Sequence, residues 1–348
     1  MRTLVISDLH LGTRAGSDVL RRPAPLARLL DALDGIDRLV LLGDVLELIV
    51  RHPRAELDAA EPILRAIGRR MGPGREIVVV PGNHDAALVR SWVRAHGPWL
   101  EPDTPVDPGA SPVLARMLSW LEPAQTSVHY PGAWLATGVW ATHGHYLDQH
   151  LFPESAFGLP RGRLRGPAGH ASIADYEGRR RRRRPSRHST LDRLLARPLA
   201  TVMEMGVELL RAAAVPWVPL ALKELRLAPL TAALMDLQMR RGAVPAIERV
   251  ARRLGVQADW VVFGHVHRRG PMDGEDWAAG PGAMRTINPG SWLFEPLLLD
   301  RAGPPHPYWP GGAVLLEPGR EPRTIGLLDD FSAAELQGAP DRRAVSAG

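Results

Sequence analysis

The chain has no cysteine and almost no lysine among its 348 residues. Without cysteine it forms neither disulfides nor thiolate metal sites, so any bound metal must be held by nitrogen and oxygen ligands. It also lacks an uncharged apolar stretch of about 18 residues, which argues against a membrane-spanning helix. The N-terminal residues carry charge too early for a secretory signal. We therefore expect a cytoplasmic protein.

The net charge of +5 is concentrated in one segment. Residues 151–190 contain ten arginines against three acidic residues, and six of these arginines are consecutive at Arg179–Arg184. We predict a basic, mobile loop over 151–190. The run could attract an anionic membrane surface or nucleic acid, or it could be a solvated charge run. No aromatic residue interleaves with the arginines, so nucleic acid is not favoured.

Short apolar runs alternate with amphipathic helical patterns along most of the chain. The strand patterns lie at 2–7, 38–42, 76–80, 139–142 and 260–263, and the helical patterns at 25–33, 55–71 and 86–95. This alternation predicts an α/β fold with helices on the faces of the sheets. Functional sites of such folds gather beyond the carboxyl ends of the strands, where the polar motifs of this chain occur.

The alternation of strand and helix patterns stops after His150, and this break divides the chain into a core and an inserted segment. We predict one discontinuous core domain, residues 1–150 and 255–330, in which 283–288, 313–317 and 323–328 complete a second sheet. Residues 191–254 read as a helical insertion, broken at prolines, and 331–348 as a flexible tail. Trp217, between two prolines, would suit a membrane interface. The alternative is a cap that packs on itself and on the core.

Five short motifs follow strand patterns. They are Asp8-Leu9-His10, Gly43-Asp44, Gly82-Asn83-His84-Asp85, His143-Gly144-His145 and Gly264-His265-Val266-His267. In a regular strand Asp8 and His10 would leave the same face and could share one cation. Each motif alone has an ordinary alternative: a helix N-cap for Asp44 or Asp85, or a surface histidine. Together they indicate a metal site.

The candidate ligands are too many for one tetrahedral ion. They are Asp8, His10, Asp44, Asn83, His143, His265 and His267. Seven ligands suit two divalent ions about 3.5–4 Å apart that share a carboxylate. The oxygen and nitrogen donors predict Mn, Fe or Zn, with manganese favoured. His84 is placed to act as an acid, and Asp85 to hold its ring and favour its charged form.

The motifs resemble those of the calcineurin-like metallophosphoesterase superfamily, D-x-H, GD, GNH(D/E), a His-Gly element and GHxH. The resemblance implies two packed mixed β-sheets flanked by helices, with a mainly helical insertion. It implies one metal on Asp8, His10, Asp44 and His267, and the other on Asp44, Asn83, His143 and His265. A metal-bridging hydroxide would attack phosphorus in line, and His84 would protonate the leaving oxygen.

A narrower resemblance is to the UDP-2,3-diacylglucosamine pyrophosphatase branch. It rests on Ser-Asp-Leu-His-Leu, Gly-Asp-Val-Leu-Glu, Gly-His-Val-His-Arg, the Pro-Gly-Ser-Trp at 289–292 and a helical insertion. In that branch the insertion covers lipid acyl chains. The chain departs from the branch in having His84 where arginine is usual, and in its longer insertion.

The sequence thus predicts a phosphoesterase acting on a phosphate or pyrophosphate of a lipid or other amphiphile, peripheral at the inner face of the membrane. Candidate substrate contacts are Arg14, His145, Asp148 and Arg268. One alternative is a soluble nucleotide or cyclic-nucleotide phosphodiesterase or phosphatase. Another is a non-catalytic metal-binding scaffold, which is less favoured because every expected ligand is present.

Overall fold

The structure is a computed structural model of the chain. It describes residues 1–13, 16–49, 54–151, 169–181, 239–278, 283–299 and 302–337. The residues in the gaps include Arg14, Arg182–Arg184 and most of the predicted helical insertion with Trp217, so the predictions for them lie outside the described residues. No helix in the described ranges is long and apolar enough to cross a membrane.

The larger sheet has seven strands in the order β11-β10-β1-β2-β3-β5-β4. Their bounds are β1 Thr3–Ile6, β2 Arg38–Leu42, β3 Glu76–Val80, β4 Thr104–Pro105, β5 Gln125–Tyr130, β10 Gly312–Leu316 and β11 Arg323–Gly326. Strands β1, β2, β3 and β5 run parallel, while β4, β10 and β11 pair antiparallel with their neighbours. The carboxyl ends of the central strands therefore share one edge.

The smaller sheet has four strands in the order β6-β7-β8-β9. Their bounds are β6 Gly132–Ala136, β7 Val139–Thr142, β8 Trp260–Phe263 and β9 Arg285–Ile287. Both sheets are mixed, as predicted, because β6 is antiparallel to β7 and the rest are parallel. The assignment of 313–317 and 323–328 to the second sheet was wrong, since β10 pairs with β1 and β11 with β10.

The two sheets pack face to face through alternate residues of their strands. In β1, Val5 joins a cluster with Val40 of β2 and with Val262 of the smaller sheet. Leu4 and Ile6 point to the other side and join the core beneath the helices. Both faces of the central strands are therefore buried, which explains why these strands are continuous apolar runs rather than alternating ones.

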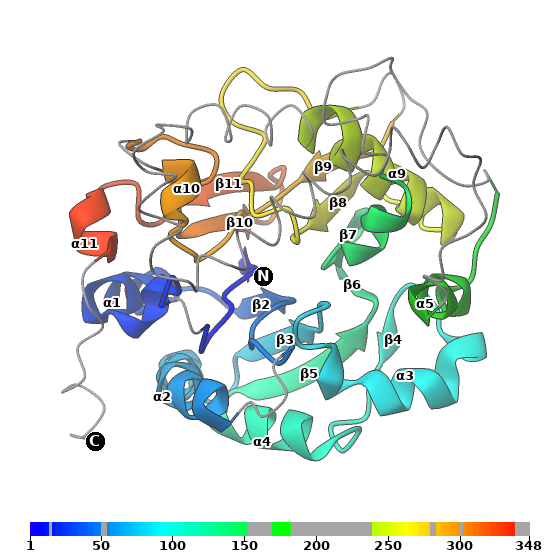
Figure 1. Cartoon of the computed structure of the whole chain (residues 1–348), viewed down its shortest axis with the longest axis horizontal. Helices are drawn as coiled ribbons and strands as arrows, with labels where there is room; N and C mark the ends of the chain where they lie inside the picture. Colours follow the sequence, from blue (N-terminus) through cyan, green and yellow to red (C-terminus); the bar gives the residue numbers. More distant parts are fainter. Residues whose placement is uncertain are drawn as a thin grey trace, which may run out of the picture.

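Helices cover the outer faces of the sheets. The α-helices are α1 Pro23–Ala32, α2 Arg54–Met71, α3 Arg90–His96, α4 Pro112–Trp120, α5 Ile173–Arg181, α9 Val244–Arg253, α10 Pro296–Leu299 and α11 Ala333–Gln337. Short turns of helix are η1 Val19–Arg21, η2 Ala86–Leu88, η3 Gly97–Trp99, η4 His145–Gln149 and η6 Met239–Ala243. Figure 1 shows α1, α2 and α4 along the larger sheet, and α9 beside β8 of the smaller one.

Two helices fall in segments predicted as a loop or a tail, and a third, in the predicted helical insertion, packs on the core. The helix α5 lies within 151–190, predicted as a loop, and α11 lies within the predicted tail, where it buries Leu336. The helix α9 was placed in the insertion, yet its buried Ile247 and Val250 belong to the main core and it packs on β8 and η4. The apolar face of a helix does not show in the sequence whether the helix packs on the core domain or on the insertion.

Candidate metal centre

The five motifs converge because the strands that precede them end at neighbouring edges. The Asp8 N–H donates to the carbonyl of Gly43 (3.1 Å), and the His10 N–H to that of Asp44 (2.8 Å). The Gly264 N–H donates to the carbonyl of His143 (3.0 Å) in the smaller sheet. These backbone bonds tie the turns together in pairs and bring both sheets to one site.

Five candidate ligands adopt left-handed backbone conformations. Asp8, His10, Asp44, His265 and His267 have φ between 44° and 71°. A residue other than glycine held there costs about 1–3 kcal/mol, and such strain clusters at functional sites. The expectation that regular strand geometry aims Asp8 and His10 was wrong, because β1 ends at Ile6 and both residues lie in the turn beyond it.

The motif glycines leave room for the side chains of other motifs. A Cβ on Gly264 would overlap the hydroxyl oxygen of Ser7 and come within 2.7 Å of Asp8 Oδ2. A Cβ on Gly82 would overlap Asp44 Oδ1, and one on Gly43 would overlap the His143 ring. These three positions therefore require glycine for close approach.

Replacing Gly264 with alanine should destabilise the protein by about 1–3 kcal/mol, because the added methyl group pushes Ser7 and Asp8 apart. The measurement is the free energy of unfolding in urea. Gly178→Ala is the matched control, since that position in α5 is open and helical and the substitution should be neutral or stabilising. Equal stability of the two variants would contradict the close packing.

One cluster consists of Asp8, His10 and His267. The Nε2 atoms of His10 and His267 are 3.3 Å apart, and His267 Nε2 is 3.3 Å from Asp8 Oδ1. Ligand atoms bound to one ion at about 2.0–2.2 Å lie roughly 3–3.5 Å from one another. The spacing therefore fits a shared cation.

A second cluster consists of Asp44, His143 and His265, and Asn83 adjoins it. His143 Nε2 lies 3.2 Å from Asp44 Oδ2 and 3.1 Å from the Asn83 carboxamide oxygen. The same oxygen, Asp44 Oδ2, is 3.7 Å from His10 Nε2 of the first cluster. Asp44 thus stands between the clusters with one oxygen toward both.

Neighbouring groups fix the orientation of these side chains. The Nδ1 atom of His143 lies 3.1 Å from the carbonyl oxygen of Leu42 and must donate to it, so Nε2 is the nitrogen that would offer its lone pair to a cation in place of a proton. The Ser7 hydroxyl lies within hydrogen-bond distance of Asp8 Oδ2, and the Trp292 N–H donates to the Asp8 carbonyl. Neither support was predicted from the sequence.

Glu47, not Asp85, holds His84. The two carboxylate oxygens of Glu47 lie 2.9 and 3.0 Å from His84 Nδ1, and one of them is 3.1 Å from His10 Nδ1. The Asp85 carboxylate instead accepts the backbone N–H groups of Gly82 and Val45, which fixes the turn. The predicted contact of Asp85 with the His84 ring was therefore wrong. The signal for Glu47 was its place three residues after Asp44.

Two carboxylates of the site have pKa values well below the usual range. Burial alone would raise the pKa of Asp8, but the charge of His267 and its hydrogen bond lower it to about 2. Hydrogen bonds from His10 and His84 likewise outweigh burial at Glu47 and lower its pKa to about 2. Burial would lower the pKa of His143, yet the adjacent Asp44 charge raises it to about 10. The site thus stabilises positive charge.

The pKa of His84 is raised as well. Burial opposes this, and the hydrogen bond to Glu47 together with the charge of Asp44 outweighs it. A quarter of the His84 side chain remains exposed, whereas the ring of His143 is fully buried. His84 therefore holds its proton more tightly than a free imidazole does, on a side chain with access to solvent.

The predicted substrate contacts have different surroundings. Arg268 is 2% exposed, forms two hydrogen bonds with the Glu275 carboxylate and stacks on Trp277, so its guanidinium is engaged in the interior and the phosphate role was wrong. His145 is buried with its ring against Tyr146. Asp148 is half exposed and contacts His265 (3.0 Å).

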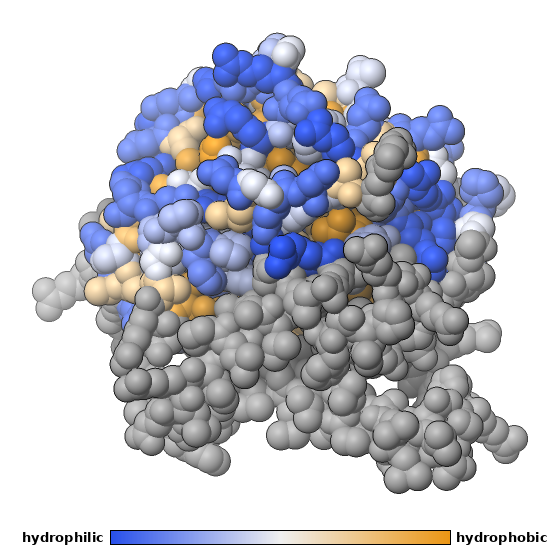
Figure 2. All heavy atoms as spheres, turned by 90° about the horizontal axis from the view of Figure 1, so that it is seen from above, coloured by the Kyte–Doolittle hydropathy of each residue, from blue (hydrophilic) through white to orange (hydrophobic). Residues whose placement is uncertain are grey.

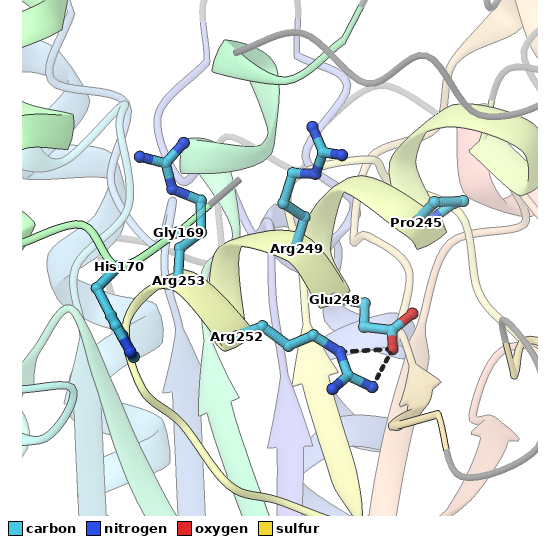
Figure 3. Close-up of a pocket in the computed structure, with 7 residues that line it drawn as sticks. All are labelled: Gly169, His170, Pro245, Glu248, Arg249, Arg252 and Arg253. Atoms are coloured by element: carbon cyan, nitrogen blue, oxygen red, sulfur yellow. Dashed lines mark hydrogen bonds and ion pairs between the residues drawn. The ribbon is translucent and has the colours of Figure 1, made fainter. Parts of the chain in front are cut away.

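A basic cavity of about 460 Å³ lies away from these clusters. Figure 3 shows it along α9, where Arg249, Arg252, Arg253 and His170 line it and Arg252 pairs with Glu248. None of the candidate ligands lines it. The chemistry therefore belongs to the strand-end clusters and not to this cavity.

The donor set fits divalent metal ions. The ligand atoms are spaced as those around a common ion, the lone pair of His143 is directed by its second nitrogen, and the carboxylates are ionised. A cation would displace the protons that the imidazoles hold here. Two packed mixed sheets with such clusters at their strand ends form a scaffold suited to a metal-dependent hydrolase.

Residues 1–269 match the calcineurin-like phosphoesterase family. The chain belongs to this family, and it is a hydrolase acting on phosphate esters. No curated protein matches the chain. Among solved structures, it is similar to Yfce, a phosphoesterase from E. coli, at 14% identity and a TM-score of 0.33, over 94% of this chain and 100% of the other.

Proposed function

We propose that the protein is a two-metal phosphoesterase whose two ions share Asp44. The proposed ligands are Asp8, His10, Asp44 and His267 for one ion, and Asp44, Asn83, His143 and His265 for the other. The observation that carries this proposal is the position of Asp44 Oδ2, 3.7 Å from His10 Nε2 and 3.2 Å from His143 Nε2. One carboxylate oxygen between two histidine sets is well placed to bind both ions of a metal pair.

When bound, the two ions would polarise the phosphoryl group and lower the pKa of a water molecule that attacks phosphorus. His84 would donate the proton from Nε2 to the leaving oxygen, since its Nδ1 is held by Glu47 and its Nε2 lies 4.0 Å from Asp44 Oδ2, on the side of the metal clusters. Glu47 keeps this proton on the ring by its negative charge. Because Glu47 also contacts His10 Nδ1, it orients the acid and a ligand together.

Asp85 and the motif glycines would act by shaping the turns. The Asp85 carboxylate joins the turn after β3 to the turn after β2 through Gly82 and Val45. The Asp44 carboxylate accepts the N–H of His84 (2.8 Å), which ties the acid to the proposed bridge. A shift of this turn would therefore move His84 and Asp44 at once.

We propose a lipid-linked or otherwise amphiphilic phosphate or pyrophosphate as substrate, with a soluble nucleotide as the alternative. Support comes from Leu48, whose N–H donates to the His84 carbonyl, and from the next residue, Ile49, whose side chain is exposed. An exposed apolar side chain one residue from this backbone contact with His84 would suit an apolar leaving group. On the face drawn in Figure 2, the described residues are mostly hydrophilic, with small apolar patches between them.

A substrate panel tests this proposal. The Mn²⁺-loaded protein is assayed against nucleotide-diphosphate lipids and lipid phosphates in detergent micelles, and against nucleotides and cyclic nucleotides in solution. We expect hydrolysis of the lipid-linked substrates and a loss of that activity, but not of p-nitrophenyl phosphate hydrolysis, in Ile49→Ser. Turnover of soluble nucleotides alone would contradict the lipid-linked substrate and support the alternative.

Our proposals for the native metal and the location of the protein rest on its donor atoms and its basic run. We propose manganese, because the donors are oxygen and imidazole nitrogen only. We propose a cytoplasmic protein held at the inner membrane face by the basic run Arg179–Arg184, which would gain about 1 kcal/mol per residue at an anionic surface. Flotation with anionic vesicles at low and high salt, with the run deleted as control, tests the membrane contact.

A further inference from the structure

His265 is held from two sides in the second cluster. Its backbone N–H donates to the Asp8 carboxylate (3.0 Å to Oδ2). Its ring Nε2 lies 3.0 Å from Asp148 Oδ1. A carboxylate accepts and does not donate, so the ring contributes the hydrogen at Nε2. In the neutral ring the lone pair is then on Nδ1.

The same arrangement recurs at two other candidate ligands. The Nδ1 of His143 is taken by the Leu42 carbonyl, and the Nδ1 of His10 by Glu47. In each ring one nitrogen lies at hydrogen-bond distance from an oxygen atom, and the other nitrogen faces the other candidate ligands of the cluster. Metal-ligating histidines usually donate their second N–H to a carboxylate or carbonyl in this way. Asp148 is the corresponding oxygen partner of His265.

Asp148 is itself held in place through its neighbours on η4. The Tyr146 hydroxyl lies 3.0 Å from the Tyr130 hydroxyl and 2.8 Å from Glu177 Oε1 of α5. On the other side, the Gln149 side chain donates to the Tyr176 carbonyl (2.8 Å), and His150 Nε2 lies 2.9 Å from the Tyr176 hydroxyl. The rings of Tyr146 and Tyr176 stack at 4.7 Å. The helix α5 therefore fixes η4 on both sides of Asp148.

We propose that Asp148 is a positioning residue that directs Nδ1 of His265 toward the second metal, and that α5 holds it there. This inference rests on the proposed function, which makes His265 a ligand. A direct contact of Asp148 with substrate is disfavoured, because a carboxylate beside an anionic phosphate repels it. The proposal links α5 to the metal site through a continuous set of contacts.

The test is Mn²⁺ binding to the full chain, measured by calorimetric titration and by electron paramagnetic resonance. In Asp148→Asn we expect one of two ions to bind about 10–100-fold more weakly, because the amide no longer attracts the ring N–H as a charge does. At two equivalents of Mn²⁺ the spectrum should then change from that of a coupled pair to that of isolated ions. Asp58→Asn is the control, since Asp58 is 71% exposed on α2.

A second variant tests the role of α5. Tyr146→Phe removes the hydroxyl that meets Tyr130 and Glu177 while it preserves the ring stack, so the fold should survive. We expect a smaller loss of affinity for the same ion. Normal binding in Tyr146→Phe would overturn the contribution of α5.

The outcomes separate this inference from the proposed function. If the wild type binds two ions and Asp148→Asn binds both with unchanged affinity, the positioning role is overturned while the two-metal site stands. If Asp148→Asn keeps both ions but has a higher KM, Asp148 contacts substrate and the inference is again overturned. A wild type that binds fewer than two ions would contradict the proposed function itself.

Discussion

Replacing His84 with alanine should lower kcat by about 10²–10⁴-fold for a substrate with a poor leaving group and leave the metal content unchanged. The reason is that Glu47 fixes the His84 ring and raises its pKa, a quarter of the side chain is open to solvent, and His84 is not one of the seven proposed ligands. The measurement is steady-state kinetics of the Mn²⁺-loaded variant together with elemental analysis. His96→Ala is the control, because His96 is exposed on α3 and bonds only the Trp92 carbonyl.

The leaving group makes this test sharper. An alcohol must be protonated as it leaves, whereas p-nitrophenolate departs without help, so the loss in His84→Ala should be much smaller for p-nitrophenyl phosphate. His84 also lies in a possible ligand group with His10 and Asp44. A variant that loses a metal ion, or that loses activity equally for both leaving groups, would remove His84 from the role of acid.

Replacing Asp44 with asparagine should remove most of the stabilisation that Mn²⁺ gives the protein. An ion present at 100 times its dissociation constant stabilises the native state by about 2.7 kcal/mol per site. Asparagine can still accept the His84 N–H through Oδ1 but cannot supply the charged oxygen that faces both clusters. Urea unfolding with and without Mn²⁺ measures the difference.

The control for this prediction is Asp103→Asn. Asp103 pairs with His129 (2.6 Å) away from the clusters, so its loss should lower the stability of the protein without changing the increment due to Mn²⁺. An Asp44→Asn protein that gains as much from Mn²⁺ as the wild type would show that Asp44 is not the shared ligand.

The convergence of the motifs could be predicted because it depends on local signals. Apolar runs that end in polar motifs give parallel strands with a common edge, and β2, β3, β7 and β8 coincide with their predicted runs. The way in which Asp8 and His10 reach the site could not be predicted, since their left-handed conformations depend on backbone bonds to Gly43 and Asp44 in another turn. The alternation of side chains along a regular strand was therefore the wrong basis for placing Asp8 and His10.

The partners of the ligands depend on contacts between distant segments. Arg268 beside the last motif resembled a phosphate clamp, and only the loop that brings Glu275 and Trp277 to it shows that it is structural. Asp148 was predicted as a substrate contact and Glu47 was given no role, because only the fold shows that both carboxylates lie against histidine rings. The strand β10 is likewise an apolar run that would suit either sheet, and β11 follows it as the next strand. Pairing with β1 is a property of the whole fold.

The central claim is that Asp44 is shared by two ions, and the number of metal ions per chain tests it most directly. The purified protein is reconstituted with Mn²⁺, desalted and analysed for metal. We predict close to two ions per chain for the wild type and a loss of most of this metal in Asp44→Asn. A wild type that retains no ion or a single one, or an Asp44→Asn protein that retains two, would contradict the account.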